Sequence, residues 1–224
     1  MSYELPGPTW TQPSMKKLIT TVAILACSQF AVAGGMESLE NFVKSAKTGK
    51  ADFTQVVTSP GKDGQAARSK TSSGTFEFQR PSRFRFDYRK PFEQTILADG
   101  QTLWLYDVDL KQVTSRKQAQ VLGSTPAALI ASSPDLNALK KDFTLEAIAD
   151  RDGMQWVQAT PKVKDGQLNS VKIGFKGNDL AALDILDSFG QRSVISFTKM
   201  ELNAGVAADN FQFKPPVGVD VVKQ

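Results

Sequence analysis

Residues 76–107 read FEFQRPSRFRFDYRKPFEQTILADGQTLWLYD, and aromatic side chains recur in this stretch at alternating positions. Phe76 and Phe78 share one face of an expected strand, and Phe84 and Phe86 share one face of the next. A period of two is typical of a β-strand with one buried face. The stretch therefore predicts an antiparallel sheet with an aromatic face, which must be covered by the protein's own core or by a bound guest.

The rest of the chain continues this pattern of short strands separated by turn residues. Asp99-Gly100 is a strong hairpin signal within the aromatic stretch. About eleven strands are expected, with polar residues 60–71 as a loop between the first two. Such a series indicates an antiparallel sheet curled into a barrel or half-barrel. The expected strands cover residues 52–58, 75–79, 83–88, 94–98, 102–106, 111–116, 143–149, 155–160, 170–175, 182–187 and 193–202.

Three helices are expected around this sheet. Apolar residues at helical spacing predict an amphipathic helix over residues 35–48, with Gly49 as its stop. Residues 126–132 (PAALIAS) predict a short apolar helix, and residues 133–140 predict another. Because the last two interrupt the series of strands, we expect them to cover one face of the sheet. The fold class is therefore mainly β with α.

The N-terminal part of the chain has the features of a secretory signal peptide. Met15-Lys16-Lys17 forms a short positive region, residues 18–30 are mostly apolar, and Ala31-Val32-Ala33 is a cleavage site. We therefore expect an upstream extension over residues 1–14, a signal peptide over 15–33 and one domain over 34–224. In an alternative, Cys27 is the acylated cysteine of a lipoprotein signal, which would anchor the protein to a membrane.

Composition excludes several kinds of chemistry from the mature protein. The chain has no histidine, and its one cysteine lies inside the predicted signal peptide. A thiol nucleophile, a histidine base and a Cys/His zinc site are therefore excluded. Asp107 and Asp109 lie between two expected strands, where aspartates commonly close turns. The net charge of +4 does not indicate a nucleic-acid partner. No catalytic residue, metal or cofactor is predicted.

Arg80 is the polar residue that stands out, because it lies among the aromatic positions and immediately precedes Pro81. One interpretation is an exposed arginine at the end of a strand. In the other, its five donors bind backbone carbonyls of the helices that cover the sheet.

These residues also occur in the order found in a known family, and the chain resembles the LolA family of periplasmic carriers of outer-membrane lipoproteins in Gram-negative bacteria. The resemblance runs across the whole predicted mature chain. It is carried by Gly74-x5-Arg80-Pro81, Phe84-x-Phe86, Pro91, Ala98-Asp99-Gly100, Leu103-Trp104-x-Tyr106, Pro126-x-x-Leu129-Ile130-Ala131 and Phe211-x-Phe213-x-Pro215-Pro216-x-Gly218. One departure is Phe86, which stands where the family is expected to have a tryptophan.

The resemblance implies an incomplete antiparallel β-barrel of about eleven strands, with a helical lid over an apolar cavity. It implies a monomer in the periplasm that receives triacylated lipoproteins from the inner-membrane transporter LolCDE and delivers them to the receptor LolB. Arg80 would hydrogen-bond the lid in the closed, empty form. The predicted acyl-binding cavity consists of Phe76, Phe78, Phe84, Phe86, Leu103, Leu105, Leu129 and Ile130.

Three other functions fit the same features. The protein could carry another hydrophobic ligand, such as a glycolipid or a quinone, on this fold. It could be a lipid sensor of envelope stress that binds an inner-membrane regulator. If Cys27 were acylated, it could be a LolB-like receptor.

Overall fold

One sheet dominates the computed structural model. The model describes residues 1–3, 34–61, 65–121, 126–131, 135–163 and 166–224. Within these ranges the sheet has twelve strands, in the order β12-β6-β5-β4-β3-β2-β1-β11-β10-β9-β8-β7. Most of the predicted extension, the whole predicted signal peptide (15–33) and the alternative acylation site Cys27 lie outside the described residues.

The strands are short to medium in length, and nearly all neighbours in the sheet are antiparallel. The exception is β12, which pairs with β6 in parallel at one edge. The strands are β1 (Thr48–Ser59), β2 (Arg68–Gln79), β3 (Arg83–Lys90), β4 (Gln94–Asp99), β5 (Thr102–Asp107), β6 (Gln112–Lys117), β7 (Phe143–Arg151), β8 (Met154–Pro161), β9 (Leu168–Lys176), β10 (Asp179–Asp187), β11 (Arg192–Leu202) and β12 (Asp220–Lys223).

The helices lie before the first strand, between β6 and β7, and after β11. They are α1 (Gly34–Ser45), α2 (Gln118–Val121), α3 (Pro126–Ala131), α4 (Leu136–Asp142) and the 3-10 helix η2 (Ala208–Phe211). α1 contacts β7 to β10, α3 contacts β3, and α4 contacts β7 and α1. None of the helices in the described ranges is long and apolar enough to cross a membrane.

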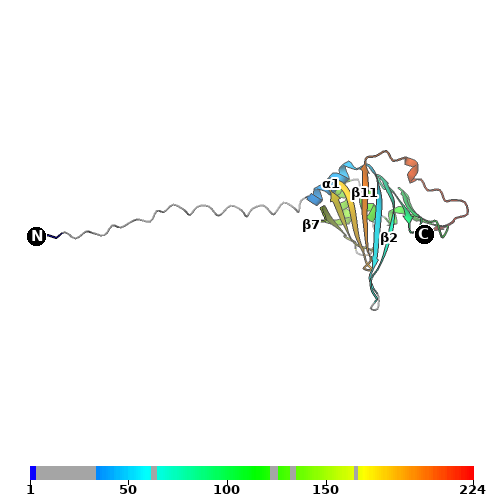
Figure 1. Cartoon of the computed structure of the whole chain (residues 1–224). Coiled ribbons are helices and arrows are strands. Elements are labelled where there is room, and N and C mark those ends of the chain that lie inside the picture. The colour runs from blue at the N-terminus through cyan, green and yellow to red at the C-terminus, as the bar shows by residue number, and fades with distance from the viewer. Residues whose placement is uncertain (4–33, 62–64, 122–125, 132–134, 164–165) are drawn as a thin grey trace.

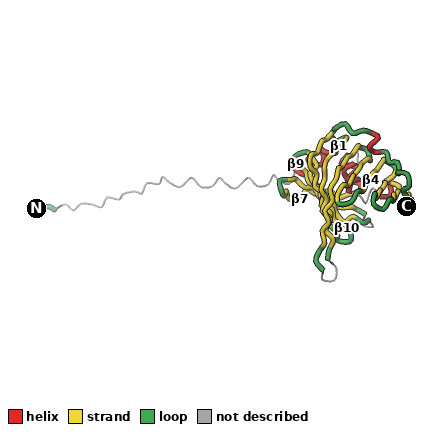
Figure 2. The backbone as a smooth tube through the Cα atoms, turned by 45° about the vertical axis from the view of Figure 1, so that its right-hand side comes forward, coloured by secondary structure: helices red, strands yellow, loops and turns green. Residues whose placement is uncertain are grey.

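The sheet curls into an open half-barrel, and its concave face holds the core (Figures 1 and 2). Buried side chains of α1, α3 and α4 pack there against inward-facing residues of the strands. The predicted fold class, a mainly β protein with an incomplete antiparallel barrel and helices over one face, is therefore confirmed. Each of the predicted strands has a counterpart, and β12 is the strand that was not predicted.

The predicted stop of the first helix at Gly49 is wrong. α1 ends at Ser45, and Gly49 lies inside β1, directly opposite Phe78 of β2. A Cβ atom on Gly49 would lie 2.3 Å from a carbon of the Phe78 ring. The glycine therefore makes room for a buried aromatic ring and does not end a helix.

The predicted loop over residues 60–71 is also wrong in its extent. β1 and β2 continue as a paired hairpin as far as Ser59 and Arg68. Figure 1 shows this hairpin reaching beyond the ends of the neighbouring strands. The polar sequence of this segment reflects strands that have left the core and are exposed to water on both faces.

The C-terminal segment covers the convex face over β2 to β5. Phe211 is 2% exposed, and the Phe213 ring lies 5.2 Å from that of Trp104. Arg85 donates to the carbonyl of Asn210 at 3.1 Å, and the Asn210 amide donates to Glu77 at 2.8 Å. This segment therefore provides the outer cover of strands whose inner face belongs to the core.

Candidate functional site

The concave face of the sheet brings together all eight residues of the predicted acyl-binding cavity. Seven of them are 0–7% exposed, and Leu105 is half-buried and packs against the same cluster. Strand pairing explains the grouping, because β2 and β3 align Phe76 with Phe86 and Phe78 with Phe84. Leu129 and Ile130 reach the cluster from α3. Acyl binding by these residues remains a prediction.

Aromatic rings form the centre of this face. The Phe76 and Phe86 centroids are 4.4 Å apart, and Phe53 meets Phe86 edge-to-face at 5.3 Å. Phe197 of β11 lies 5.3 Å from Phe76. Phe53 and Phe197 do not belong to the predicted set of cavity residues. Their inward positions on strands that were correctly predicted are the signal that could have identified them.

Helix α1 fills one side of the concave face. Its residues Leu39, Phe42 and Val43 are buried at helical spacing. The Phe42 ring lies 6.0 Å from that of Phe78 and 5.8 Å from that of Phe175. Side chains of α1 therefore occupy this part of the concave face.

The turn between β2 and β3 connects the sheet to the helices. The Arg80 guanidinium donates from Nη1 to the Val43 carbonyl of α1 at 3.2 Å and lies 5.3 Å from the centre of the Phe42 ring. The Arg80 backbone amide donates to Lys47, and the Ser82 amide donates to the Ala131 carbonyl at the end of α3 at 2.8 Å. The turn is thus hydrogen-bonded to α1 and the residues just after it on one side, and to the end of α3 on the other.

Burial changes the acid–base character of Arg80. It lowers the pKa of the guanidinium from 12.5 to about 10, because a charged group loses solvation inside the protein. The side chain therefore stays charged at neutral pH. The interpretation of Arg80 as an exposed arginine at the end of a strand is wrong, because its Nε and Nη2 atoms are buried and its Nη1 donates to Val43. The described contact is with α1, whereas the resemblance implied the lid; the role of a lid latch remains a prediction.

Gln118 is a second polar residue of this region, and sequence reasoning missed it. It is 1% exposed at the start of α2. Its amide nitrogen donates to the Ser82 carbonyl at 2.6 Å, and its oxygen accepts from the Gly100 amide at 2.9 Å. Gln118 therefore links the turn between β2 and β3 to the turn between β4 and β5. A single glutamine after a predicted strand gives no distinctive signal.

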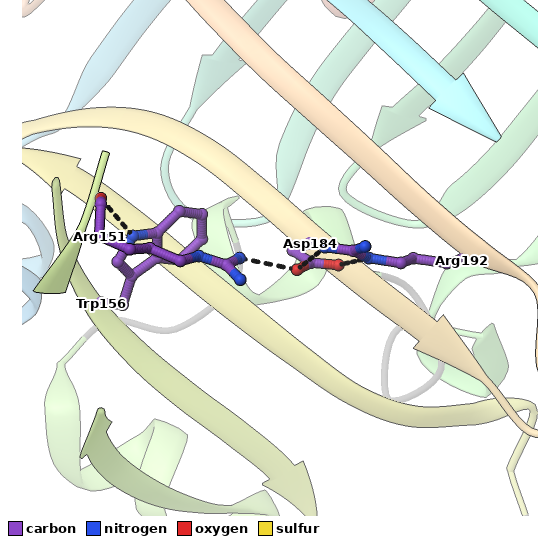
Figure 3. A network of polar contacts seen from close by, with 4 residues as sticks. All are labelled: Arg151, Trp156, Asp184 and Arg192. Carbon is purple, nitrogen blue, oxygen red and sulfur yellow. Dashed lines mark hydrogen bonds and ion pairs between the residues drawn. The ribbon is translucent and has the colours of Figure 1, made fainter. Parts of the chain in front are cut away.

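A polar cluster of Arg151, Asp184 and Arg192 lies beside Trp156 on the half of the sheet that contains β7 to β11 (Figure 3). Asp184 is 6% exposed and binds Arg192 at 2.7 Å and Arg151 at 2.9 Å. Hydrogen bonding from Arg192 and then from Arg151 lowers the pKa of Asp184 below 3.8. Arg151 also covers the buried Trp156 ring at 4.4 Å. The one carboxylate is bonded by both arginines, so the cluster links β7, β10 and β11 in this half of the sheet.

The pair Asp107 and Asp109 acts as a turn, as predicted. The Asp107 carboxylate accepts from the Leu110 amide at 2.9 Å, which closes the connection between β5 and β6. Within the described part of the chain, no three His, Cys, Asp or Glu side chains gather in a way that could hold a metal ion.

Comparison with known proteins agrees with this architecture. The model of the family described as outer membrane lipoprotein carrier protein LolA matches residues 44–214. The chain is 64% identical to the outer-membrane lipoprotein carrier protein of Albidiferax ferrireducens over 212 residues, covering 93% of this chain and 100% of that relative. It is 52% identical to the protein of the same name from Methylibium petroleiphilum, covering 90% of this chain and 96% of the relative.

Solved structures show only a distant likeness. A LolA superfamily protein from Nitrosomonas europaea has a TM-score of 0.47 and 11% identity, covering 81% of this chain and 98% of that one. A likeness of this size does not bear on function. The family match spans most of the chain, and the relatives match it over nearly their whole length. The chain therefore belongs to the LolA family of outer-membrane lipoprotein carrier proteins.

Proposed function

We propose that this protein carries outer-membrane lipoproteins through the periplasm by holding their acyl chains against the concave face of its sheet. The observation that supports this most strongly is the aromatic concave face, covered by helices that are bonded to the Arg80 turn. The names of relatives that match over nearly their full length support the same role.

The physical need for such a face follows from the chemistry of the cargo. Each methylene group moved out of water contributes about 0.8 kcal/mol, so one long acyl chain resists water by on the order of 10 kcal/mol. A carrier must cover the chains with apolar surface and must also release them. A helical layer that has to be displaced would hold the affinity down, because opening it costs free energy that the guest must offset.

The two partners would act at the two membranes between which the cargo moves. The protein would work as a monomer, accept triacylated lipoproteins from LolCDE at the inner membrane and pass them to LolB at the outer membrane. It would perform no catalysis and need no cofactor. The predicted signal peptide supports export to the periplasm.

Native mass spectrometry of the protein purified from periplasm tests this proposal. We expect an adduct whose mass corresponds to a triacylated lipoprotein. Loss of the adduct after the acyl chains are removed enzymatically would be the matching control. A glycolipid or quinone adduct would instead support a carrier of another ligand, and stable recovery of an inner-membrane regulator would support a stress sensor; either result would contradict the proposal.

A further inference from the structure

The concave face changes character along the length of its strands. Towards the Arg80 turn the inward positions hold the aromatic core, whereas towards the other end hydrogen-bonding side chains are mixed with apolar ones such as Val57. On β1 the sequence of inward residues runs from Phe53 to Gln55, and on β2 it runs from Phe76 back to Ser72. Because side chains alternate along a strand, these residues lie on the same face. One surface is therefore apolar at one end and offers hydrogen-bonding groups among apolar ones at the other.

The end of this face that lies away from the Arg80 turn lines an open pocket of about 690 Å³. This volume lies within the range of about 300–1,000 Å³ that is usual for ligand pockets. Uncharged hydrogen-bonding side chains come from several strands, and apolar residues, including the 58% exposed Phe92, lie among them. The other apolar lining residues are Val57, Pro91 and Leu110. The uncharged polar groups include Gln55, Ser72, Gln94 and Gln191.

Tyr88 marks the boundary between the core and the pocket. Its ring lies 5.0 Å from Phe53 and 6.4 Å from Phe86, so it extends the aromatic row. Its hydroxyl donates to Gln55 at 2.9 Å, and Gln55 in turn donates to Ser193 at 2.7 Å. The pocket therefore continues directly from the face on which the acyl chains would lie.

The charges around the pocket are balanced. Arg68 and Lys70 contribute positive charge from β2, while Asp107 and Asp109 contribute negative charge from the end of β5 and the turn after it. Lys70 also lies 4.8 Å from the centre of the exposed Phe92 ring. A site for a phosphodiester headgroup would need an excess of positive charge. Balanced charge with many neutral donors and acceptors suits a polypeptide backbone with small polar side chains.

We infer that this pocket binds the polypeptide segment that follows the acylated residue of the cargo. The inference rests on the proposed function, because the segment reaches the pocket only if the acyl chains lie on the aromatic face. The carrier then binds the acyl chains on its aromatic face and the peptide in the pocket. Free lipids, which lack a peptide, would contact only the aromatic face.

The test compares two synthetic ligands and three variants. The ligands are a triacylated cysteine followed by the peptide Ser-Ser-Asn-Ala, and the same triacylated cysteine as an amide without a peptide. Ser72→Trp fills the pocket, and Gln94→Ala removes one hydrogen-bonding group without adding bulk. Thr71→Trp is the matched control, because it places the same ring on the other face of the same strand, where Thr71 is exposed. Thermal unfolding confirms that each variant is folded.

We expect Ser72→Trp to weaken binding of the lipopeptide about tenfold, and Gln94→Ala to weaken it about threefold. Binding of the amide should stay within about twofold of wild type in every variant, and Thr71→Trp should bind both ligands as wild type does. Equal losses for both ligands, or no loss for the lipopeptide in either pocket variant, would overturn the inference. If wild type bound neither ligand, the proposed function itself would be contradicted.

Discussion

Replacing Arg80 with leucine is expected to loosen the helical layer without unfolding the sheet. The Arg80 guanidinium donates to Val43 at 3.2 Å, and a hydrogen bond from a charged donor contributes about 1.5–3 kcal/mol. Burial acts in the opposite direction, because it lowers the pKa of Arg80 from 12.5 to about 10; such a shift corresponds to about 3 kcal/mol of lost solvation. Since leucine removes both effects, the free energy of unfolding should change by less than about 2 kcal/mol.

The same net change should appear in the local equilibrium between closed and open helical layers. Up to about 2 kcal/mol of net loss from the closed state raises the open population by as much as roughly 30-fold. An acyl ligand that binds only the open state gains apparent affinity by the same factor, until the open state predominates. The variant should therefore hold its cargo more tightly and transfer it to LolB less well.

Hydrogen exchange, urea unfolding and ligand binding together measure these effects. The Ser82 amide, which bonds to the Ala131 carbonyl, should exchange faster in the Arg80→Leu variant. Arg83→Leu is the control, because it removes an equal charge from an exposed arginine nearby that donates to Gln79. If Arg80→Leu left both Ser82 exchange and ligand affinity as in the control, the reasoning about the turn would be refuted.

Three further substitutions test the packing and the charges of the fold. Gly49→Ala should lower stability in urea by about 1–3 kcal/mol, because the new Cβ would lie 2.3 Å from the Phe78 ring, whereas Gly205→Ala, with open space around it, should be neutral. Asp184→Asn should lower the free energy of unfolding at neutral pH by about 1–2 kcal/mol. The loss is no larger because the arginine partners are partly exposed, and solvent screens the ion pairs. The lowered pKa of Asp184 means that this difference should vanish as the pH falls below 3.8, which acid unfolding of both proteins would show. Burial raises the pKa of Tyr88 from 10.0 to about 12. As the pH rises from 10 to 12, the free energy of unfolding of wild type should therefore fall by up to about 3 kcal/mol relative to that of Tyr88→Phe. Equal alkaline unfolding curves for the two proteins would contradict the burial of Tyr88.

The sequence was sufficient to predict the sheet because burial on one face imposes a period of two. Phe76, Phe78, Phe84 and Phe86 were predicted to share a face, and strand pairing places them directly opposite one another. The edge strand β12 was missed because its residues are exposed on both faces and show no alternation. Gly49 was misread because a glycine required by a ring on another strand looks the same in sequence as one that ends a helix.

The site was predictable in part for similar reasons. The aromatic positions could be grouped from their spacing, whereas the partners of Arg80 depend on how α1 packs against the sheet. No local pattern contains that information, so the contact with Val43 could not be foreseen. Gln118 was missed for the same reason, since its two partners are brought together only by the fold.

Release of a lipoprotein from spheroplasts tests the central claim most directly. Spheroplasts that have accumulated a labelled triacylated lipoprotein are incubated with the mature protein, residues 34–224, and the supernatant is analysed. The account predicts that the lipoprotein appears there in a soluble complex with this protein, in an amount that follows the amount of protein added. A lipoprotein that stays with the spheroplasts, at protein concentrations where the LolA-family protein from Albidiferax ferrireducens releases it, would contradict the account.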